Sequence, residues 1–308
     1  MTPSFLLTFD VETYSFGTNQ YEDSVAAEVF HVGLPRLVDL LDKYSIKATF
    51  FFTGQIAALE PGCVRLVKAA GHEVGCHGYW HEVDRAFDTL SYEEQIKDLF
   101  LAKAAIETVA GKVISFRAPA ARINENTVLA LEKTGFQIDS SIASQRFDGP
   151  LTFGARKKLA WLTAPRGPYY LSYESINRRG QSPILELPIS AALLPYIGTT
   201  MRISPLTTKI LQSLLFLESR KTGRPIVFLF HPNECLDAPT SITTTRRARS
   251  TIKYYLADRL RHQLKQRNLG LPSLMLLDGV IKDALRYGFS FLTMSEYAEL
   301  TKRKCEGV

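Results

Sequence analysis

The sequence predicts an α/β protein built as a distorted (β/α) barrel of seven or eight units, and three observations support this prediction. Short apolar segments alternate with amphipathic ones from residue 5 to residue 139, as they do in parallel β/α folds. Residues 48–52 (ATFFF) are almost wholly apolar, which is typical of a strand covered on both faces. A length of 308 residues allows one large core, so we expect a single domain over residues 1–308.

The first half of the chain contains the clearest elements. Ser91 and Glu94 form a capping-box pattern that starts a helix, whereas Gly71 and Gly135 each end one. Gly54 is expected to end the second strand. Strands are expected at residues 5–9, 48–52, 73–77, 113–116 and 136–139. Helices are expected at residues 34–44, 61–70, 91–110 and 124–133.

The second half keeps this rhythm but carries two insertions. The first, at about residues 143–183, is rich in Arg, Gly, Pro and Tyr, and the second, at about residues 235–270, changes from irregular to helical. The remaining strands are expected at residues 184–187, 226–230 and 289–292. The remaining helices are expected at residues 206–221 and 274–286 and from Ser295 onward.

Composition and missing motifs narrow the class of function. The net charge of +6 fits an anionic substrate, a membrane surface or nucleic acid, and equally a basic protein without a charged partner. Four cysteines without a CxxC pair indicate reduced thiols rather than a disulfide framework. The chain begins without the basic and apolar regions of a signal peptide, and the apolar stretch at 187–201 is short for a membrane span. We therefore expect a cytoplasmic protein. Serine-hydrolase, P-loop and dinucleotide-binding motifs do not occur, and no nucleic-acid partner is expected.

Polar residues follow five of the expected strands, each at the carboxyl end. In a β/α barrel these ends converge on one face, where active sites lie. A single such residue would mean little, but five strands that each deliver one make coincidence a poor explanation. The residues are Asp10, Glu12, His77, His81, Arg117, Asp139 and His231.

The spacing of four of these residues points to a metal site. Asp10 and Glu12 are two apart, so an extended backbone directs both side chains to the same side. His77 and His81 are four apart, which on a strand would separate them by about 13 Å. A helical turn after Gly78 would bring their Cβ atoms within about 5–6 Å. Two imidazoles and one carboxylate suit a catalytic zinc ion with an open water position. The alternative is that both histidines are ordinary loop residues.

The ordered motifs resemble those of a known family. Residues 8–12 (TFDVE), the HxxxH pair, Arg117–Ala118–Pro119, Asp139 and residues 228–232 (FLFHP) are similar to the motifs of the polysaccharide deacetylases. This group is also called the NodB homology domain, or carbohydrate esterase family 4. The similarity covers residues 4–141, with further parts at 184–231 and 288–298. It implies a distorted barrel that hydrolyses an N-acetyl group of an amino sugar.

The resemblance also implies a metal set. Glu12, His77 and His81 would bind a divalent metal, with Zn²⁺ as the first choice. The family commonly has adjacent aspartates where this chain has Asp10 and Val11, so that the acid ligand becomes Glu12. Relatives with an acid at this later position act on lipid-linked or peptidoglycan sugars, or are sugar deformylases.

The remaining roles follow the same resemblance. Asp10 would be the general base, and Arg117 would hold and tune it. His231 would be the general acid, and Asp139 would lie in the motif that orients His231 or adjusts its pKa. Ala120 stands where many relatives carry an aromatic residue, which argues against a polymer groove like theirs.

A basic segment at 246–267 suggests what the protein binds besides the sugar. Its only acid is Asp258, and Ile252, Leu256, Leu260 and Leu264 recur at helical spacing. Such a helix could contact an anionic membrane and meet a lipid-linked or phosphate-bearing sugar at the inner membrane surface. The alternative is an ordinary surface helix whose leucines pack on the barrel. The eight cations are Arg246, Arg247, Arg249, Lys253, Arg259, Arg261, Lys265 and Arg267.

The expected function is therefore metal-dependent deacetylation of an amino sugar in a polysaccharide or a lipid-linked glycan by a catalytic barrel. Three alternatives stay open. The chain could deformylate a lipid-linked formamido sugar, or bind sugars without catalysis. It could also hydrolyse a cyclic amide that is not a sugar.

Overall fold

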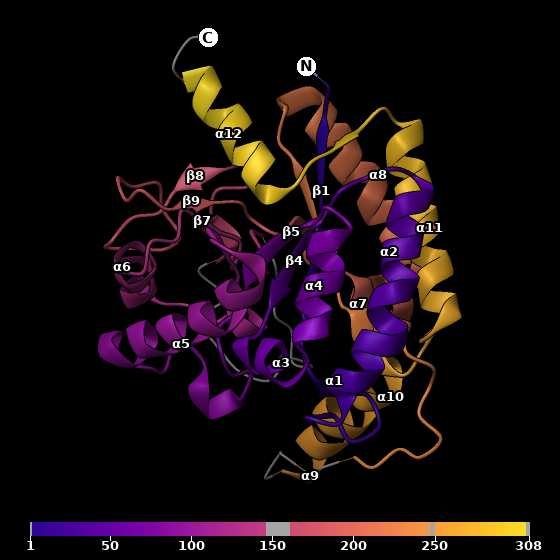
Figure 1. Ribbon diagram of the computed structural model, residues 1–308. Helices are drawn as coiled ribbons and strands as arrows, with labels where there is room; N and C mark the ends of the chain where they lie inside the picture. The colour runs from indigo at the N-terminus through magenta and orange to yellow at the C-terminus, as the bar shows by residue number, and fades with distance from the viewer. Residues whose placement is uncertain (1, 146–160, 245, 247–249, 306–308) are drawn as a thin grey trace.

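A curled, mostly parallel sheet forms the centre of the computed structural model, which describes residues 2–145, 161–244, 246 and 250–305 (Figure 1). The strands of this sheet are β1 (Ser4–Val11), β4 (Thr49–Phe52), β5 (Glu73–Cys76), β6 (Ser115–Phe116), β7 (Ile138–Asp139), β8 (Tyr169–Tyr170), β9 (Leu185–Glu186), β12 (Ile226–Phe230) and β13 (Ser290–Phe291). Two small ribbons pair β2 (Tyr14–Ser15) with β3 (Gln20–Tyr21) and β10 (Ala191–Ala192) with β11 (Leu194–Pro195).

Helices surround this sheet. They are α1 (Val25–Glu28), α2 (Leu34–Lys43), α3 (Gly54–Leu59), α4 (Pro61–Ala69), α5 (Tyr92–Ala110), α6 (Glu125–Lys133), α7 (Gly198–Ile203), α8 (Pro205–Thr222), α9 (Thr251–Lys253), α10 (Arg261–Lys265), α11 (Leu271–Arg286) and α12 (Met294–Cys305). Short 3₁₀ turns are η2 (Val83–Arg85), η3 (Pro119–Ala121) and η5 (Pro232–Cys235), and wider π-helical segments are η1 (Val29–Gly33) and η6 (Tyr254–Leu260).

The sheet curls into the predicted barrel. Its order is β12-β1-β4-β5-β6-β7-β9-β8, with β13 beside the first residues of β1. All neighbours are parallel except β8, which pairs antiparallel with β9. The chain after β9 reaches β12, where the Ser190 N–H donates to the carbonyl of Val227 at 3.0 Å. This bond draws the two ends of the curled sheet together, and the predicted distorted barrel is confirmed.

The core explains why these segments become strands and helices. Every residue of β1 and β12 is buried, because helices cover both elements, and strands of this kind are mostly apolar. Phe9 of β1 stacks on Phe50 of β4 with ring centres 4.4 Å apart. The predicted capping box is present: the Ser91 hydroxyl accepts from the Glu94 N–H, and the Glu94 carboxylate accepts from the Ser91 N–H.

The second strand ends before Gly54, as expected, but the helix that follows it was not predicted. Gly54 begins α3, and the hydroxyl of Thr53 caps this helix by accepting from the N–H of Ile56. Gly54 is required there because a Cβ would lie 2.3 Å from the Tyr79 ring. The close approach of α3 to the loop after β5 therefore needs glycine, and this packing reason was hidden in the sequence.

In the second insertion, the expectation that the leucines of the basic segment pack on the barrel is wrong. Its helix consists of α9, η6 and α10, and Arg247 and Arg249 lie outside the described residues. Ile252, Leu256 and Leu260 are exposed rather than packed on the barrel. Within the described part of the chain, no helix combines the length and the hydropathy needed to cross a bilayer.

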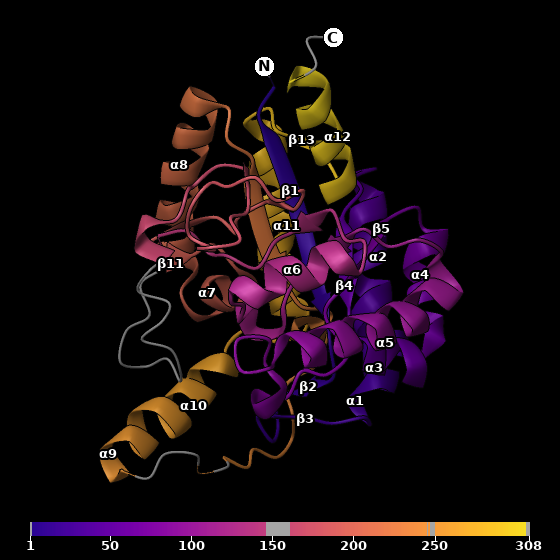
Figure 2. The ribbon, with the colours of Figure 1, turned by 90° about the vertical axis from the view of Figure 1, so that its left-hand side faces the viewer.

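The barrel has two different ends. Both chain ends lie at one of them, and β1 runs from there toward the end where α1, α3 and α10 gather (Figures 1 and 2). Because the strands are parallel, the residues that follow them collect at this second end.

Candidate active site at the carboxyl ends of the strands

Strand β1 brings two carboxylates to this end of the barrel. Asp10 is the penultimate residue of β1 and Glu12 follows the strand directly, and both are buried. Arg117, which follows β6, donates from Nη1 to Asp10 Oδ1 at 2.9 Å. The same guanidinium donates to the hydroxyl of Thr8 and to the carbonyl and hydroxyl of Ser140. Arg117 is therefore fixed on several sides and holds Asp10 in one orientation.

The loop after β5 brings His77 and His81 together. Their ring centres are 5.2 Å apart, as the spacing predicted, but residues 77–81 form no helical turn. The chain instead bends at Gly78, which has a φ of 67°. The expected proximity and the change of direction at Gly78 are both correct, but the chain makes this bend through a left-handed glycine rather than a helical turn.

Glu12, His77 and His81 fit a metal ion. One ligand atom from each residue lies within 4.8 Å of the others. His77 Nδ1 donates to the carbonyl of Arg117 at 2.7 Å, which leaves the lone pair on Nε2. That Nε2 atom and Glu12 Oε2 are buried without a hydrogen-bond partner, and buried polar atoms of this kind are suited to bind a metal ion. Burial alone would raise the pKa of Glu12, but His81 and His77 hold it well below its ordinary value.

The N–H of Ala120 lies beside this cluster. It donates to His81 Nε2 at 3.1 Å. This Nε2 atom of His81 also lies 3.0 Å from Glu12 Oε2. The Ala120 φ of 52° is uncommon for a residue with a side chain, and such outliers concentrate at functional sites. A metal ion that used the lone pair of His81 would let the Ala120 N–H donate to a substrate oxygen instead.

His231, which follows β12, has a partner that the sequence analysis missed. Its Nδ1 donates to Glu234 Oε1 at 2.9 Å, and Arg202 of α7 donates from Nε to Glu234 Oε2 at 2.8 Å. Burial lowers the pKa of His231, but the bond to Glu234 and the charges of Glu12, Glu234 and Asp10 raise it to about 9. His231 is thus held as a charged donor close to the carboxylates of β1. The available signal was a glutamate three residues after the histidine, across Pro232, where a tight turn brings both side chains together.

Asp139 lies elsewhere. It accepts from the hydroxyl of Ser141 and forms a buried carboxyl pair with Glu186 of β9. Burial raises the pKa of Asp139 to about 6 and raises the pKa of Glu186 well above its ordinary value. The direct partner of His231 in the structure is therefore Glu234 and not Asp139. Asp139 lies next to Ser140, whose carbonyl accepts from Arg117.

Replacing Gly78 by alanine should lower the free energy of unfolding by about 2–4 kcal/mol. The new Cβ would take a left-handed conformation and lie 3.1 Å from atoms of Phe87 and Pro119. Gly223→Ala is a matched control, because Gly223 has a φ of 73° but nothing within 4 Å of its Cβ position. Urea unfolding should show a loss of about 1–2 kcal/mol for this control. Equal losses in both variants would show that the packing around Gly78 has no role.

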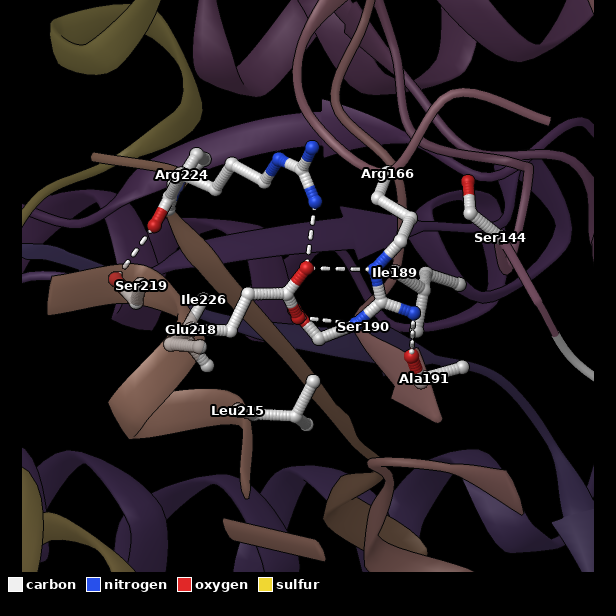
Figure 3. Close-up of a pocket in the computed structure, with 11 residues that line it drawn as sticks. Ser144, Arg166, Ile189, Ser190, Ala191, Leu215, Glu218, Ser219, Arg224 and Ile226 are labelled. Atoms are coloured by element: carbon white, nitrogen blue, oxygen red, sulfur yellow. Dashed lines mark hydrogen bonds and ion pairs between the residues drawn. The ribbon is translucent and has the colours of Figure 1, made fainter. Parts of the chain in front are cut away.

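A second polar pocket lies apart from these residues. Arg166 donates from Nε to Glu218 at 2.7 Å, and Arg224 donates to the same carboxylate at 2.5 Å (Figure 3). Arg166 also donates to the carbonyl of Ala191 at 2.8 Å. One carboxylate on α8 therefore pairs with two guanidinium groups, and these contacts join α8 to the chain on either side of it.

Comparisons with known proteins agree with the site. Residues 2–138 match the family described as polysaccharide deacetylase. A peptidoglycan deacetylase of Helicobacter pylori is 33% identical over 136 residues, which cover 43% of this chain and 45% of that protein. A peptidoglycan deacetylase-like protein of Gibberella zeae is 32% identical over 144 residues, which cover 44% of this chain and 42% of that protein. The chain thus spans less than half the length of these relatives.

The fold has a counterpart among solved structures. A protein assigned to the polysaccharide deacetylases in Mycobacterium smegmatis superimposes with a TM-score of 0.53 at 22% identity. The match covers 75% of this chain and 78% of that one, so the likeness in fold extends beyond the segment matched in sequence. Residues 2–138 of this chain are thus similar in sequence to the polysaccharide deacetylase family.

Proposed function

We propose that this protein is a metal-dependent hydrolase that removes the acetyl group from the nitrogen of an amino sugar in a glycan. The observation that carries the proposal is one cluster at the carboxyl end of the barrel. It joins three metal-ligand atoms to a held carboxylate, Asp10, and a charged imidazole, His231. Zn²⁺ is the first choice because two imidazoles and a carboxylate suit it.

The metal, when bound by Glu12, His77 and His81, would polarise the amide carbonyl and acidify water. Asp10 takes the proton of the attacking water, since Arg117 bonds only one of its oxygens at 2.9 Å and fixes its direction. The Arg117 cation also lowers the cost of a buried carboxylate. Asp10 Oδ2 lies 3.7 Å from His77 Nε2, so the base stands beside the ligand cluster.

The other residues act on the leaving side. An amine departs readily only once it is protonated, and His231 supplies this proton from Nε2 because Glu234 holds Nδ1. The N–H of Ala120 donates to the oxygen that becomes negative as the water adds. Together these groups provide a base, an acid and an oxyanion donor, which amide hydrolysis requires.

Peptidoglycan is the first substrate class to test, since one relative is named a peptidoglycan deacetylase and another a peptidoglycan deacetylase-like protein. A lipid-linked or phosphate-bearing sugar is the second, because the basic segment 246–267 lies beside the site: Lys265 Nζ donates to the hydroxyl of Tyr14. Deformylation is the alternative reaction, favoured by Val11 between the two acids. Location at the cytoplasmic face of a membrane stays a prediction, as does the single domain over residues 1–308.

The Asp10→Asn variant should test the reaction. Zinc-loaded protein is incubated with peptidoglycan fragments, chitooligosaccharides and a lipid-linked N-acetyl sugar, and acetate and free amine are measured together. Without its base the variant should lose about 10²–10⁴-fold in kcat, whereas Asp84→Asn, at an exposed position, should keep full activity.

Three outcomes would contradict deacetylation. Formate released from an N-formyl sugar, without acetate from any substrate, would establish the deformylase. Saturable sugar binding with neither product would establish a non-catalytic binding protein. Turnover of a cyclic amide alone would establish a third class of amidohydrolase.

A further inference from the structure

Helix α8 presents an apolar stripe to solvent. Leu206, Ile210 and Leu217 are 54–74% exposed, and spacings of four and seven residues place them on one face. The opposite face is buried through Leu211 and Leu215. Exposed apolar side chains are ordinary when scattered, but a continuous row on one helix marks an interaction surface.

The helix of the second insertion repeats this pattern. Ile252, Leu256 and Leu260 are 39–72% exposed and are spaced by four residues. On its other side His262 is buried, with Nε2 at 2.7 Å from the carbonyl of Phe16. This anchor fixes the helix on the body and leaves its apolar row outward. Figure 2 shows α8, α9 and α10 along the same side of the molecule.

The charges beside both rows are positive. Arg220 and Lys221 are exposed at the end of α8, and Arg259 is exposed on the second helix. The only acid of α8 is Glu218, which pairs with Arg166 and Arg224.

The second helix and the neighbouring α11 add no exposed negative charge to these rows. The only acid of residues 251–265 is the buried Asp258. Beside α8, Asp283 of α11 is paired with Lys209. Among the described residues of α8 and of 251–265, no exposed carboxylate balances the cations.

The two apolar rows and the cations beside them indicate what kind of partner this surface would bind. A second copy of the chain would bring the same cations against one another in a symmetric contact. An anionic bilayer accepts both parts of the surface, because its acyl region takes apolar side chains and its headgroups take cations. We propose that the side formed by α8 and residues 251–265 docks on an anionic lipid membrane. The proposal does not depend on the reaction at the active site.

The test is co-sedimentation of the whole protein with vesicles. One set contains phosphatidylcholine alone, and the other contains three parts phosphatidylcholine and one part phosphatidylglycerol. Wild type should bind the anionic vesicles at least about tenfold more tightly and lose this preference in high salt. Leu206→Glu with Leu217→Glu, and separately Leu256→Glu with Leu260→Glu, should each weaken binding about tenfold or more.

A matched control is Phe100→Glu with Leu101→Glu on α5, where both side chains are comparably exposed; it should bind like wild type. Circular dichroism confirms folding of every variant. The proposal would be overturned if wild type bound both vesicle types equally or bound neither. It would also be overturned if the α8 double variant and the insertion double variant both bound as tightly as wild type. A dimer in sedimentation velocity that the same substitutions dissociate would assign this surface to a second copy, and would overturn it too.

Discussion

Replacing His77 and His81 together by alanine should remove the bound divalent metal and lower kcat/KM by about a thousandfold or more. Both imidazoles lie against Glu12, and a single carboxylate is a weak ligand for zinc. A thousandfold corresponds to about 4 kcal/mol of transition-state stabilisation, which is within the range for an ion that polarises the reacting carbonyl. Elemental analysis and activity are measured on the same preparations.

The control for this pair is His31→Ala, because His31 is exposed and lies away from the cluster. It should retain both metal and activity. If wild type takes up no divalent metal even with zinc in excess, the metal site is refuted and a sugar-binding role becomes the better account. Full metal content in the double variant would show that other residues hold the ion.

Replacing Glu234 by glutamine should have the second-largest effect, and it should change the pH profile rather than metal content. Glu234 is the principal group that raises the pKa of His231, so its loss should move the alkaline limb of kcat/KM down by about 1–3 pH units. The variant should also lose about 3–5 kcal/mol of stability, because Arg202 is buried and loses its carboxylate. The profile is measured on metal-loaded protein at temperatures where the variant stays folded.

The sign of the stability change with pH follows from the same contact. The pKa of His231 is raised from its ordinary value to about 9 in the folded protein. Its stabilising contribution is therefore complete below the ordinary pKa and is lost as the pH rises through about 9. Wild type should lose stability across this window, and Glu234→Gln should show a smaller loss.

Asp139→Asn is the comparison that separates the two candidate partners of His231. Because Asp139 contacts Ser141 and Glu186 instead, this variant should keep the alkaline limb of wild type. A shift caused by Asp139→Asn, with none caused by Glu234→Gln, would restore the role first expected of Asp139.

The contrast between these two acids shows how far the sequence could predict the site. Asp10, Glu12, His77 and His81 were predictable because they lie at or shortly after the carboxyl ends of two strands, and parallel strands bring such residues together. The partner of His231 was not, because the family motif pointed to Asp139 while a tight turn through Pro232 folds Glu234 back onto the ring. Arg202 lies on α7, in a region without a clear helical pattern, and its contact depends on packing between distant segments.

The fold shows the same division. Long segments with an obvious apolar period, such as α5 and β12, were placed within about two residues. Helix α3 was missed because Gly54 is dictated by the nearby Tyr79 ring. The outward rows at 251–260 were expected on one of two hypotheses, and the spacing alone could not say which side of that helix would face the barrel.

The contacts of Arg202 also limit which segments of this chain can be exchanged with those of a relative. The guanidinium holds Glu234 and, through Nη1, the carbonyls of Lys265 and Arg267 at 2.6 and 2.9 Å. The last turn of the insertion thus belongs to the support of His231. A chimera that takes residues 241–260 from a relative should acquire a new docking preference and keep the reaction. A chimera in which the exchanged segment extends through Arg267 must also take α7 from the same relative.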